Sequence, residues 1–481
     1  MARQLDAMRA GEVTARELVT EYLSRIDHFN EQLNAYRLVF GEEALAQADA
    51  ADRRRERGED APLLGVAIAV KEDIALAGLP TTKGTNAAHT PAPADAAVVR
   101  RLRAAGAIVI GRARMPELGL WPFTETTWAG PTRNPWSLEH SPGGSSGGPA
   151  AAVAAGLAAA AIGTDGGGSL SVPASVTGLF TIKPQRGRVS MAPEQQLWGG
   201  LVVVAPLTRT VLDWALIADQ LVGAEPDDEH VARPPRTTFT EAARTHPSRL
   251  RIGVSLRPWG PGIRIDDEPR NSVLRTVVLL SELGHDVVRL DPPMKDLTAS
   301  TAFGMRYLSN AHEARMTMEL PDAVEPRTKA VGELGRRLPK PLVRWANRGD
   351  ARLTEFANRI FAEVDVLLTP ALSRPPIKIA EWDGIRVVRA LSSSASYATF
   401  LPLWNIAGNP AAVVPAGHTT AGLPLGVQLI GRRHDECTLL SLSGQLEQAR
   451  PWAQRIPPGF RHDEQSRNQP VPPPEDTPPR P

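Results

Sequence analysis

The sequence predicts an α/β protein, and three observations support this prediction. Between residues 63 and 111, apolar runs of strand length alternate with a helix-length segment, which is the order of elements in α/β folds. The 481 residues are enough chain for one large domain or two ordinary ones with a full core. Further apolar runs of strand length at 364–369 and 426–431 indicate that the sheet continues into the second half of the chain.

Residues 1–57 are expected to form two or three amphipathic helices that pack over a sheet. Thr14 precedes Ala15-Arg16-Glu17, so its side chain can cap a helix whose third residue supplies the carboxylate of a capping box. Leu18, Tyr22, Leu23 and Ile26 then fall on one helical face.

The later elements follow from the same patterns. Residues 225–265 are rich in Pro, Asp and Arg and are expected to be mainly surface loop. The tail 461–481, which contains PVPPPEDTPPRP, is expected to be disordered or extended. The predicted strands are 66–70, 107–111, 251–254, 285–290, 364–369 and 426–431, and the predicted helices are 96–105, 271–283 and several within 300–365.

Two Gly/Ser clusters between Ser141 and Pro184 are the strongest chemical signal in the chain. The first is GGSSGG at 143–148 and the second is GTDGGGS at 163–169. The segment between them is alanine-rich and is expected to be helical or buried, which argues against a flexible linker. Glycine costs backbone entropy when it is ordered, so the clusters need another reason. Gly166, Gly167 and Gly168 could direct several N–H groups at one oxygen beside the Ser169 hydroxyl, as an oxyanion hole requires.

A serine hydroxyl needs a base, and Lys71 is the candidate. It closes the apolar run LLGVAIAV at 63–70, which is typical of a buried strand. Burial lowers the pKa of a lysine toward neutrality, so a lysine held there could accept a proton. A solvated strand terminus is the alternative interpretation. His140 is the one histidine beside either cluster.

Together these motifs resemble the amidase signature hydrolases. GGSSGG, GTDGGGS, PAS and GLFTIKP follow one another in the order and spacing of that family's signature. The segments GVAIAVKEDI, NIAGNPAAVVPAG and GLPLGVQLIGRRHDE are similar to its flanking blocks. The resemblance covers residues 1 to about 455 and is weakest between roughly 225 and 365. It implies an amidase-signature fold, with one large mixed, twisted β-sheet covered by helices on both faces.

The resemblance implies one amidase signature domain over residues 1–460. Within it we expect N-terminal helices at 1–57, a catalytic signature core at 63–210, a variable region that sets substrate specificity at 225–365, and the C-terminal part of the core at 366–460.

The resemblance also implies the roles of the site residues. Ser169 is the nucleophile, Ser145 is a bridging serine in a cis peptide, and Lys71 is the base. The N–H groups of Gly166, Gly167, Gly168 and Ser169 form the oxyanion hole. Neutral Lys71 takes the proton of Ser145, which takes that of Ser169 as it attacks a carbonyl and forms an acyl-enzyme. No metal and no organic cofactor is expected.

The chain departs from the family pattern at several positions. Family members usually carry an arginine two residues after the nucleophile, where this chain has Ser171. Asp165 therefore lacks that ion-pair partner and is expected to act as a turn or cap residue. Pro149 follows GGSSGG and is expected at the first position of a helix. Thr181 and Gln185 replace residues common in the family. None of these changes removes a catalytic group, but they prevent substrate preference from being carried over.

Aromatic residues gather between 115 and 136 in a chain that is only 5% aromatic. We interpret Trp121, Trp128 and Trp198 as walls of a substrate pocket, with ordinary core packing as the alternative. The predicted substrate is therefore a small hydrophobic or aryl amide. Carbamates (urethanes) and esters are further candidates for the same chemistry.

Charge and cysteine content limit the kinds of partner and site that the sequence predicts. A net charge of +1 gives no electrostatic reason to expect nucleic acid or a membrane surface. The short arginine runs, such as 53–55, are interpreted as solvated helix faces. Cys437 is the only cysteine, which excludes an internal disulfide and a Cys-rich metal site, and it is expected at the start of a helix. The N-terminus lacks the apolar core of a signal peptide. We expect a cytoplasmic monomer or homodimer.

Three alternatives stay open. Residues 143–147 also fit G-x-S-x-G, the nucleophile elbow of α/β-hydrolases, with His418, His434 or His462 as the late histidine. The segment before it is turn-like rather than a strand, which counts against an elbow. The component of a glutamine-dependent amidotransferase that releases ammonia from glutamine would share the catalytic residues and work in a complex. A non-catalytic binding protein would not need Lys71, Ser145 and Ser169 intact.

Overall fold

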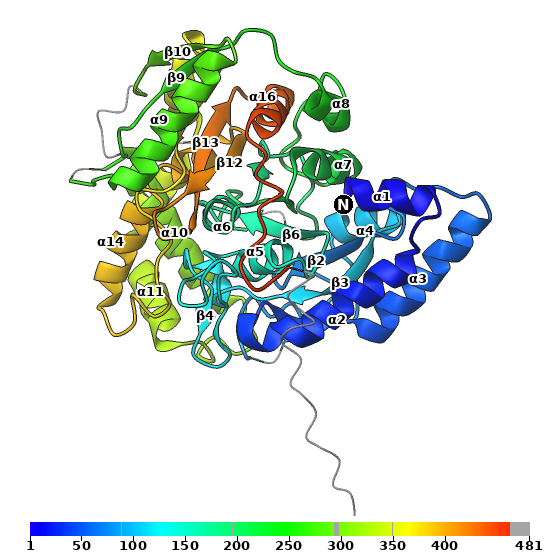
Figure 1. The fold of residues 1–481 in the computed structure, drawn as a ribbon. Helices are drawn as coiled ribbons and strands as arrows, with labels where there is room; N and C mark the ends of the chain where they lie inside the picture. The colour runs from blue at the N-terminus through cyan, green and yellow to red at the C-terminus, as the bar shows by residue number, and fades with distance from the viewer. Residues whose placement is uncertain (88, 195–196, 261, 293–297, 349, 462–481) are drawn as a thin grey trace, which may run out of the picture.

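The structure is a computed structural model that describes residues 1–461 except 88, 195–196, 261, 293–297 and 349 (Figure 1). The predicted Pro-rich tail and His462 lie outside the described residues, apart from Arg461. Within the described part of the chain, helices and strands alternate along the sequence, which confirms the predicted α/β class. No helix among the described residues is long and apolar enough to cross a membrane.

Five strands from the first half of the chain form one sheet. Their order is β1-β3-β2-β6-β8, with β2 parallel to both β3 and β6 and the two outer pairs antiparallel. Every residue of β2 and β6 is buried. Because successive side chains of a strand point to opposite faces, both faces of this sheet must be covered. The strands are β1 (Tyr36–Val39), β2 (Ala67–Lys71), β3 (Ile108–Ala113), β6 (Ala160–Asp165) and β8 (Val203–Leu207).

Six strands form a second sheet in the order β10-β9-β11-β13-β12-β7. Phe180, just before β7, and Thr208, just after β8, exchange two backbone hydrogen bonds of 2.8 and 3.0 Å. This bridge joins the two ladders into the predicted large mixed sheet. The strands are β7 (Thr181–Lys183), β9 (Arg251–Val254), β10 (Asp286–Arg289), β11 (Val366–Pro370), β12 (Ala411–His418) and β13 (Pro424–Gly431).

Helices pack on the central strands and shield them from solvent. All eight residues of β13 are buried, because α6 (Ser171–Thr177), α9 (Asp267–Glu282) and α16 (Glu436–Ala449) all contact it. The other helices that flank the sheets are α1 (Ala2–Arg9), α2 (Ala15–Leu33), α3 (Gly41–Glu56), α4 (Ala97–Ala104), α5 (Gly147–Ala154), α7 (Val211–Leu221) and α8 (Phe239–Arg244).

A group of helices from the second half of the chain packs beside the sheet, with α10, α11 and α14 on one side of the molecule (Figure 1). They belong mainly to the segment that resembles the family least. The group comprises α10 (Thr298–Met316), α11 (Pro326–Arg336), α12 (Lys340–Arg348), α13 (Asp350–Asn358), α14 (Val387–Tyr397) and α15 (Pro402–Ala407), with a short helical turn at Arg359–Ala362. The first half of the chain adds another short helical turn at Glu117–Gly119 and a small hairpin of β4 (Glu125–Thr126) and β5 (Gly130–Pro131).

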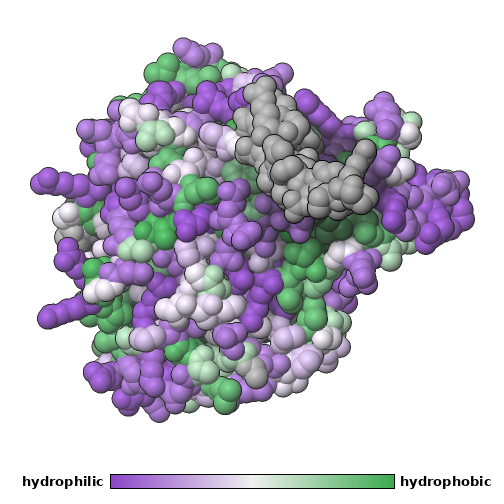
Figure 2. All heavy atoms as spheres, turned by 60° about the horizontal axis from the view of Figure 1, so that its bottom comes forward, coloured by the Kyte–Doolittle hydropathy of each residue, from purple (hydrophilic) through white to green (hydrophobic). Residues whose placement is uncertain are grey.

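The N-terminal helix α2 confirms the predicted capping, and on its predicted apolar face Tyr22 and Ile26 are buried while Leu18 and Leu23 are partly exposed. Thr14 and Glu17 form the complete capping box of α2. Of the arginine run 53–55 at the end of α3, Arg53 is exposed and Arg54 pairs with Glu59 at 3.0 Å, whereas Arg55 is partly buried and donates to the Leu64 carbonyl. Figure 2 shows this end as a hydrophilic projection at the right of the molecule.

The alanine-rich segment after GGSSGG is buried as expected, and it holds two elements, because α5 ends at Ala154 and β6 begins at Ala160. Other local expectations need correction. Pro149 is the third residue of α5 rather than the first, since the helix already begins at Gly147. The N-terminal region holds a strand as well as helices, because β1 pairs with the distant strand β3. The segment 225–265 is not only loop, because it contains α8, which the buried side chain of Phe239 stabilises.

Candidate active site

Lys71 ends β2 at the carboxyl edge of the first sheet. The neighbouring parallel strand β6 ends at the same edge, and this brings Thr164 beside the lysine. Polar groups at the carboxyl ends of adjacent parallel strands are where α/β sheets usually bind ligands. The Nζ atom of Lys71 lies 2.7 Å from the Oγ atom of Ser145 and 2.7 Å from Oγ1 of Thr164. The lysine is fully buried, so the alternative of a solvated terminus is excluded.

Burial lowers the pKa of Lys71, and Asp73 opposes that effect. The Oδ2 atom of Asp73 lies 3.2 Å from Nζ and accepts a hydrogen bond of 2.6 Å from Thr164. A buried lysine whose pKa is depressed can exist in its neutral form and accept a proton. The environment therefore suits a base whose protonation is set by a balance between desolvation, which lowers its pKa, and nearby carboxylates, which raise it, Asp73 first and then Asp165 and Glu72.

Ser145 is buried, and the peptide bond between Gly144 and Ser145 is cis. The chain here is tightly enclosed, because a Cβ atom at position 144 would lie 2.5 Å from the Trp121 carbonyl oxygen and 2.6 Å from that of Phe123. Only glycine fits at this position. The first Gly/Ser cluster thus lets the backbone pass close to a neighbouring segment and present one hydroxyl to Lys71.

The second cluster forms a loop that the Asp165 carboxylate holds in place. Asp165 accepts hydrogen bonds from the N–H groups of Gly168 (2.7 Å), Leu170 (2.9 Å) and Ser171 (3.3 Å), and from the Ser171 hydroxyl (3.2 Å). Asn405 adds a further hydrogen bond of 2.9 Å from its side-chain amide. The expectation that Asp165 acts as a turn or cap residue is confirmed. Ser171 and Asn405 donate hydrogen bonds to its carboxylate, which an arginine would otherwise pair with.

The loop leaves three N–H groups without an acceptor. Within the part of the chain that the structure describes, the amides of Gly166, Gly167 and Ser169 make no hydrogen bond, whereas the amide of Gly168 is engaged by Asp165. Ser169 itself is partly exposed. A partly exposed hydroxyl beside free N–H groups is an arrangement that can bind the oxygen of a carbonyl group.

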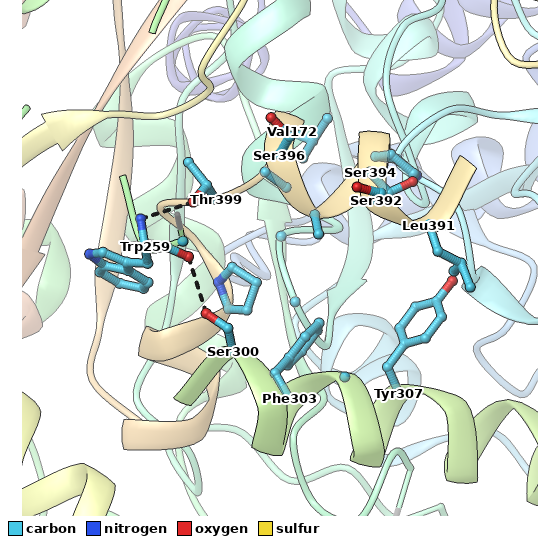
Figure 3. A pocket seen from close by; sticks show the side chains of 18 of the residues that line it. Val172, Trp259, Ser300, Phe303, Tyr307, Leu391, Ser392, Ser394, Ser396 and Thr399 are labelled. Carbon is cyan, nitrogen blue, oxygen red and sulfur yellow. Dashed lines mark hydrogen bonds between the residues drawn. The ribbon is translucent and has the colours of Figure 1, made fainter. Parts of the chain in front are cut away.

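Ser169 opens onto a cavity of about 670 Å³. One wall comes from α10 and the opposite wall from α14, and Figure 3 shows Ser300, Phe303 and Tyr307 facing the serines of α14 across the space. Trp259 is held at one end by hydrogen bonds between its backbone and the hydroxyls of Ser300 and Thr399. No aspartate, glutamate, lysine, arginine or histidine lines this cavity among the described residues.

A second, much smaller cavity of about 50 Å³ lies on the other side of Ser169. Ser145, Thr164 and Asp73 line it, together with Lys83. Gly119, Ser169 and Trp198 line both cavities and so separate them.

The predicted aromatic residues divide into two groups. Trp121 and Trp198 line the large cavity, as expected for pocket walls. Trp128 lines neither cavity among the described residues, and its ring is covered by the guanidinium groups of Arg37 and Arg114 while its Nε1 donates to the Gly84 carbonyl. Trp128 therefore has a packing role, which is the alternative to a pocket wall that the sequence left open.

Sequence reasoning missed Asp73, Thr164 and the contribution of α14, whereas α10 lies within the region 225–365 that was expected to set substrate specificity, although no cavity residue on it was named. A signal existed for the first two, since KED follows a buried strand at 71–73 and Thr164 precedes the glycine loop. Polar residues at the ends of two adjacent parallel strands meet at one edge. No such local signal marks the helices that form the cavity. The three histidines of the elbow alternative do not reach the site, since neither His418 nor His434 lines either cavity, and His462 is not among the described residues.

Comparisons with known proteins show the family to which the chain belongs. Residues 17–440 match the family model described as Amidase. The chain is 42% identical over 460 residues to "Putative amidase AmiB2" of Mycobacterium tuberculosis (strain ATCC 25618 / H37Rv), covering 95% of this chain and 97% of that protein. It is also 35% identical over 484 residues to a glutamyl-tRNA(Gln) amidotransferase component of Halorhodospira halophila (strain DSM 244 / SL1), covering 94% and 98%.

Solved structures are similar over almost the whole chain. The structure of a 6-aminohexanoate cyclic dimer hydrolase with its substrate superposes with a TM-score of 0.87 at 28% identity, covering 95% of this chain and 98% of that one. A bacterial aryl acylamidase of the amidase signature enzymes superposes with a TM-score of 0.84 at 26% identity, covering 93% and 96%.

Proposed function

The chain belongs to the amidase family of C–N hydrolases, and on this premise we propose that it hydrolyses small uncharged amides with an apolar or aryl acyl group. The acyl group would be carried on Ser169, with Ser145 and Lys71 as the proton relay. The observation that carries the choice of substrate is the large cavity beside Ser169, which is lined by aromatic and small hydroxyl side chains and by no charged one among the described residues.

The proposed reaction follows from the contacts around Lys71. Neutral Lys71 accepts the proton of Ser145, Ser145 accepts the proton of Ser169, and the Ser169 Oγ atom attacks the carbonyl carbon. The resulting oxyanion would accept hydrogen bonds from the N–H groups of Gly166, Gly167 and Ser169. We leave the amide of Gly168 out of this group, because the Asp165 carboxylate already accepts its hydrogen bond.

The second half of the reaction uses the same groups in reverse. The proton returns from Lys71 through Ser145 to the nitrogen, the C–N bond breaks, and the amine leaves. Water then attacks the Ser169 ester while the relay again accepts a proton, which releases the acid and restores the serine. Carbamates and esters meet the same requirements, so we include urethane and ester hydrolysis as side activities of the proposed enzyme.

The ammonia-releasing component of a glutamine-dependent amidotransferase is the second candidate, because a relative with that role in its name shares 35% identity over nearly the full length. Free glutamine carries an α-ammonium and an α-carboxylate, and burying unpaired charges is costly. The large cavity offers neither charge a partner among the described residues. This weighs against glutamine and favours neutral substrates, such as those implied by the names of the cyclic dimer hydrolase and the aryl acylamidase.

The proposal is tested by labelling the purified chain with a fluorophosphonate and mapping the adduct by peptide mass spectrometry. We expect an adduct on Ser169 that is formed far more slowly in Lys71→Ala, and hydrolysis of benzamide in preference to glutamine. An adduct on Ser146 that does not depend on Lys71 would contradict the relay. Release of ammonia from glutamine but not from benzamide would favour the amidotransferase component.

A further inference from the structure

The two cavities that meet at Ser169 differ more than tenfold in volume, at about 670 and about 50 Å³. An amide bound at Ser169 has two arms, the acyl group and the amine, which must extend in different directions from the carbonyl carbon. The shape of the site therefore treats the two arms unequally.

Proton transfer decides the assignment. When the C–N bond breaks, the nitrogen must receive a proton from the relay, so it must lie within reach of the Ser145 hydroxyl. Ser145 and Thr164 line the small cavity, and neither lines the large cavity. The amine arm therefore belongs on the side of the small cavity and the acyl arm on the side of the large one.

The small cavity also holds an acceptor for N–H groups. The Oδ2 atom of Asp73 is occupied by Thr164 and Lys71, but its Oδ1 atom is buried and has no hydrogen-bond partner among the described residues. Buried acceptors are normally satisfied. An N–H donor of a primary amide could pair with Oδ1 only after the Asp73 side chain turns, because the atom has almost no accessible surface.

The walls of the small cavity limit the size of the amine. Apart from its polar end, it is enclosed by apolar side chains, and a volume of about 50 Å³ holds no more than a few water-sized groups. A phenyl or longer alkyl substituent on nitrogen would have to displace this wall. The wall is formed by Met115, Leu118, Leu197, Trp198, Val202 and Ala314.

We propose that the small cavity is the leaving-amine subsite and that it restricts the enzyme to primary amides and amides of very small amines, whereas bulky apolar acyl groups are accepted. This inference rests on the proposed amidase function and specifies its substrate class. It assigns aryl groups to the acyl arm of the substrate rather than to the amine.

The test compares amides that share one acyl group. We would measure kcat/KM for benzamide and for its N-methyl, N-propyl and N-cyclohexyl derivatives, whose alkyl amines differ in size but little in basicity. We expect a fall of about tenfold or more for each step beyond methyl, since single methylene groups are discriminated on that scale in a closed pocket. Equal rates for benzamide and N-propylbenzamide would overturn the subsite but leave the amidase function standing.

A pair of variants locates the restriction. Met115→Ala enlarges the small cavity and should raise kcat/KM for N-propylbenzamide relative to benzamide by about tenfold. The control, Ile263→Ala, enlarges the large cavity and should leave that ratio unchanged while altering the preference among acyl groups. A ratio that responds to Ile263→Ala and not to Met115→Ala would overturn the assignment of the two arms.

A measurement on the unaltered protein guards against misfolding of the variants. Benzoyl transfer from benzamide to added methylamine or propylamine, two amines of nearly equal basicity, is deacylation through the same amine position. We expect efficient formation of N-methylbenzamide and little N-propylbenzamide, and equal capture of both amines would refute the subsite. Failure to hydrolyse any of these amides, with no label on Ser169, would instead refute the proposed function and the inference with it.

Discussion

The Nζ atom of Lys71 and the Oγ atom of Ser145 lie 2.7 Å apart, although 74 positions separate the two residues in the chain. Lys71 is brought there by the end of a buried strand and Ser145 by a glycine-rich turn. Both side chains are shielded from water. The protonation state of Lys71 is therefore governed by its immediate neighbours, of which Asp73 is the charged one in contact.

Removing the charge of Asp73 should move the pH profile of the enzyme. Burial lowers the pKa of Lys71 and Asp73 raises it, so Asp73→Asn leaves burial less opposed and lowers that pKa further. Because the relay requires neutral Lys71, the rising limb of kcat/KM should shift to lower pH in Asp73→Asn. The measurement is kcat/KM for benzamide against pH. Thr164→Val, which removes a neutral contact to the same lysine, is the matched control and should move the limb less. A shift of the limb to higher pH would contradict the proposed role of Lys71.

Asp165 should matter far more than Ser171 for the stability of the Ser169 loop. Asp165→Ala leaves the buried N–H groups of Gly168 and Leu170 without their acceptor, at about 1–3 kcal/mol for each donor, while the Asn405 amide keeps its hydrogen bond to the backbone carbonyl of residue 165. Ser171→Ala removes one hydroxyl hydrogen bond to the same carboxylate, about 1 kcal/mol. Urea unfolding of both variants measures the difference. Equal losses of stability would show that Ser171 carries more of the loop than its single side-chain contact suggests.

Glu125 should make the protein less stable as the pH rises. Burial raises the pKa of Glu125 to about 7, only partly offset by the hydrogen bond from the Ala380 N–H. A carboxyl whose pKa is higher in the folded state binds its proton more tightly there, so stability falls as the pH rises from the ordinary carboxyl range through about 7 and stays lower above it. Glu125→Gln removes this ionisation and should raise the melting temperature relative to the parent at pH 8 more than at pH 5. Glu363 is exposed, so Glu363→Gln is the control, and its melting temperature should match that of the parent at both pH 5 and pH 8. A larger gain at pH 5 would reverse the assigned sign.

The parts of the site that sequence can predict are those written in short, contiguous motifs. Lys71 closes an uninterrupted apolar run, and such a run is buried on both faces only as an inner strand of a covered sheet, which is where β2 lies. The glycines at 143–148 and 166–168 indicate close backbone approach, and the contacts of a Cβ atom at Gly144 explain the need for glycine there. The role of Asp165 as a cap is predictable because the arginine that would pair with it is absent.

The cavity walls cannot be predicted in the same way. α10 and α14 are separated by about seventy residues, and their facing side chains become neighbours only through the packing of both helices beside the sheet. Nothing local distinguishes Trp121, which lines the cavity, from Trp128, which anchors a loop under two arginines. In the alanine-rich segment the sequence does not fix the type of element, because alanine tolerates helix and buried strand alike. Pairing with β2 makes the second half of this segment a strand.

The contact between the Ser169 loop and α10 gives a direct test of how the cavity is built. Gly167 faces the ring of Phe303, and a Cβ atom at position 167 would lie 2.5 Å from the ring's Cζ atom. Gly167→Ala should therefore push the phenyl ring aside, disturb a free N–H of the loop and lower kcat/KM for benzamide. Overpacking of this kind typically costs about 1–3 kcal/mol.

The second variant separates crowding from a loss of backbone freedom. The ring atom that collides is at the far end of a side chain, and Gly167 has no left-handed backbone conformation that would exclude alanine. Gly167→Ala combined with Phe303→Leu should thus recover much of the lost kcat/KM, while Phe303→Leu alone should change it little for an acyl group as small as benzoyl. Recovery in the double variant would establish that α10 and the loop share one wall of the acyl cavity. A double variant as impaired as Gly167→Ala alone would mean that position 167 needs glycine for its own backbone, and that the contact with Phe303 does not set the activity.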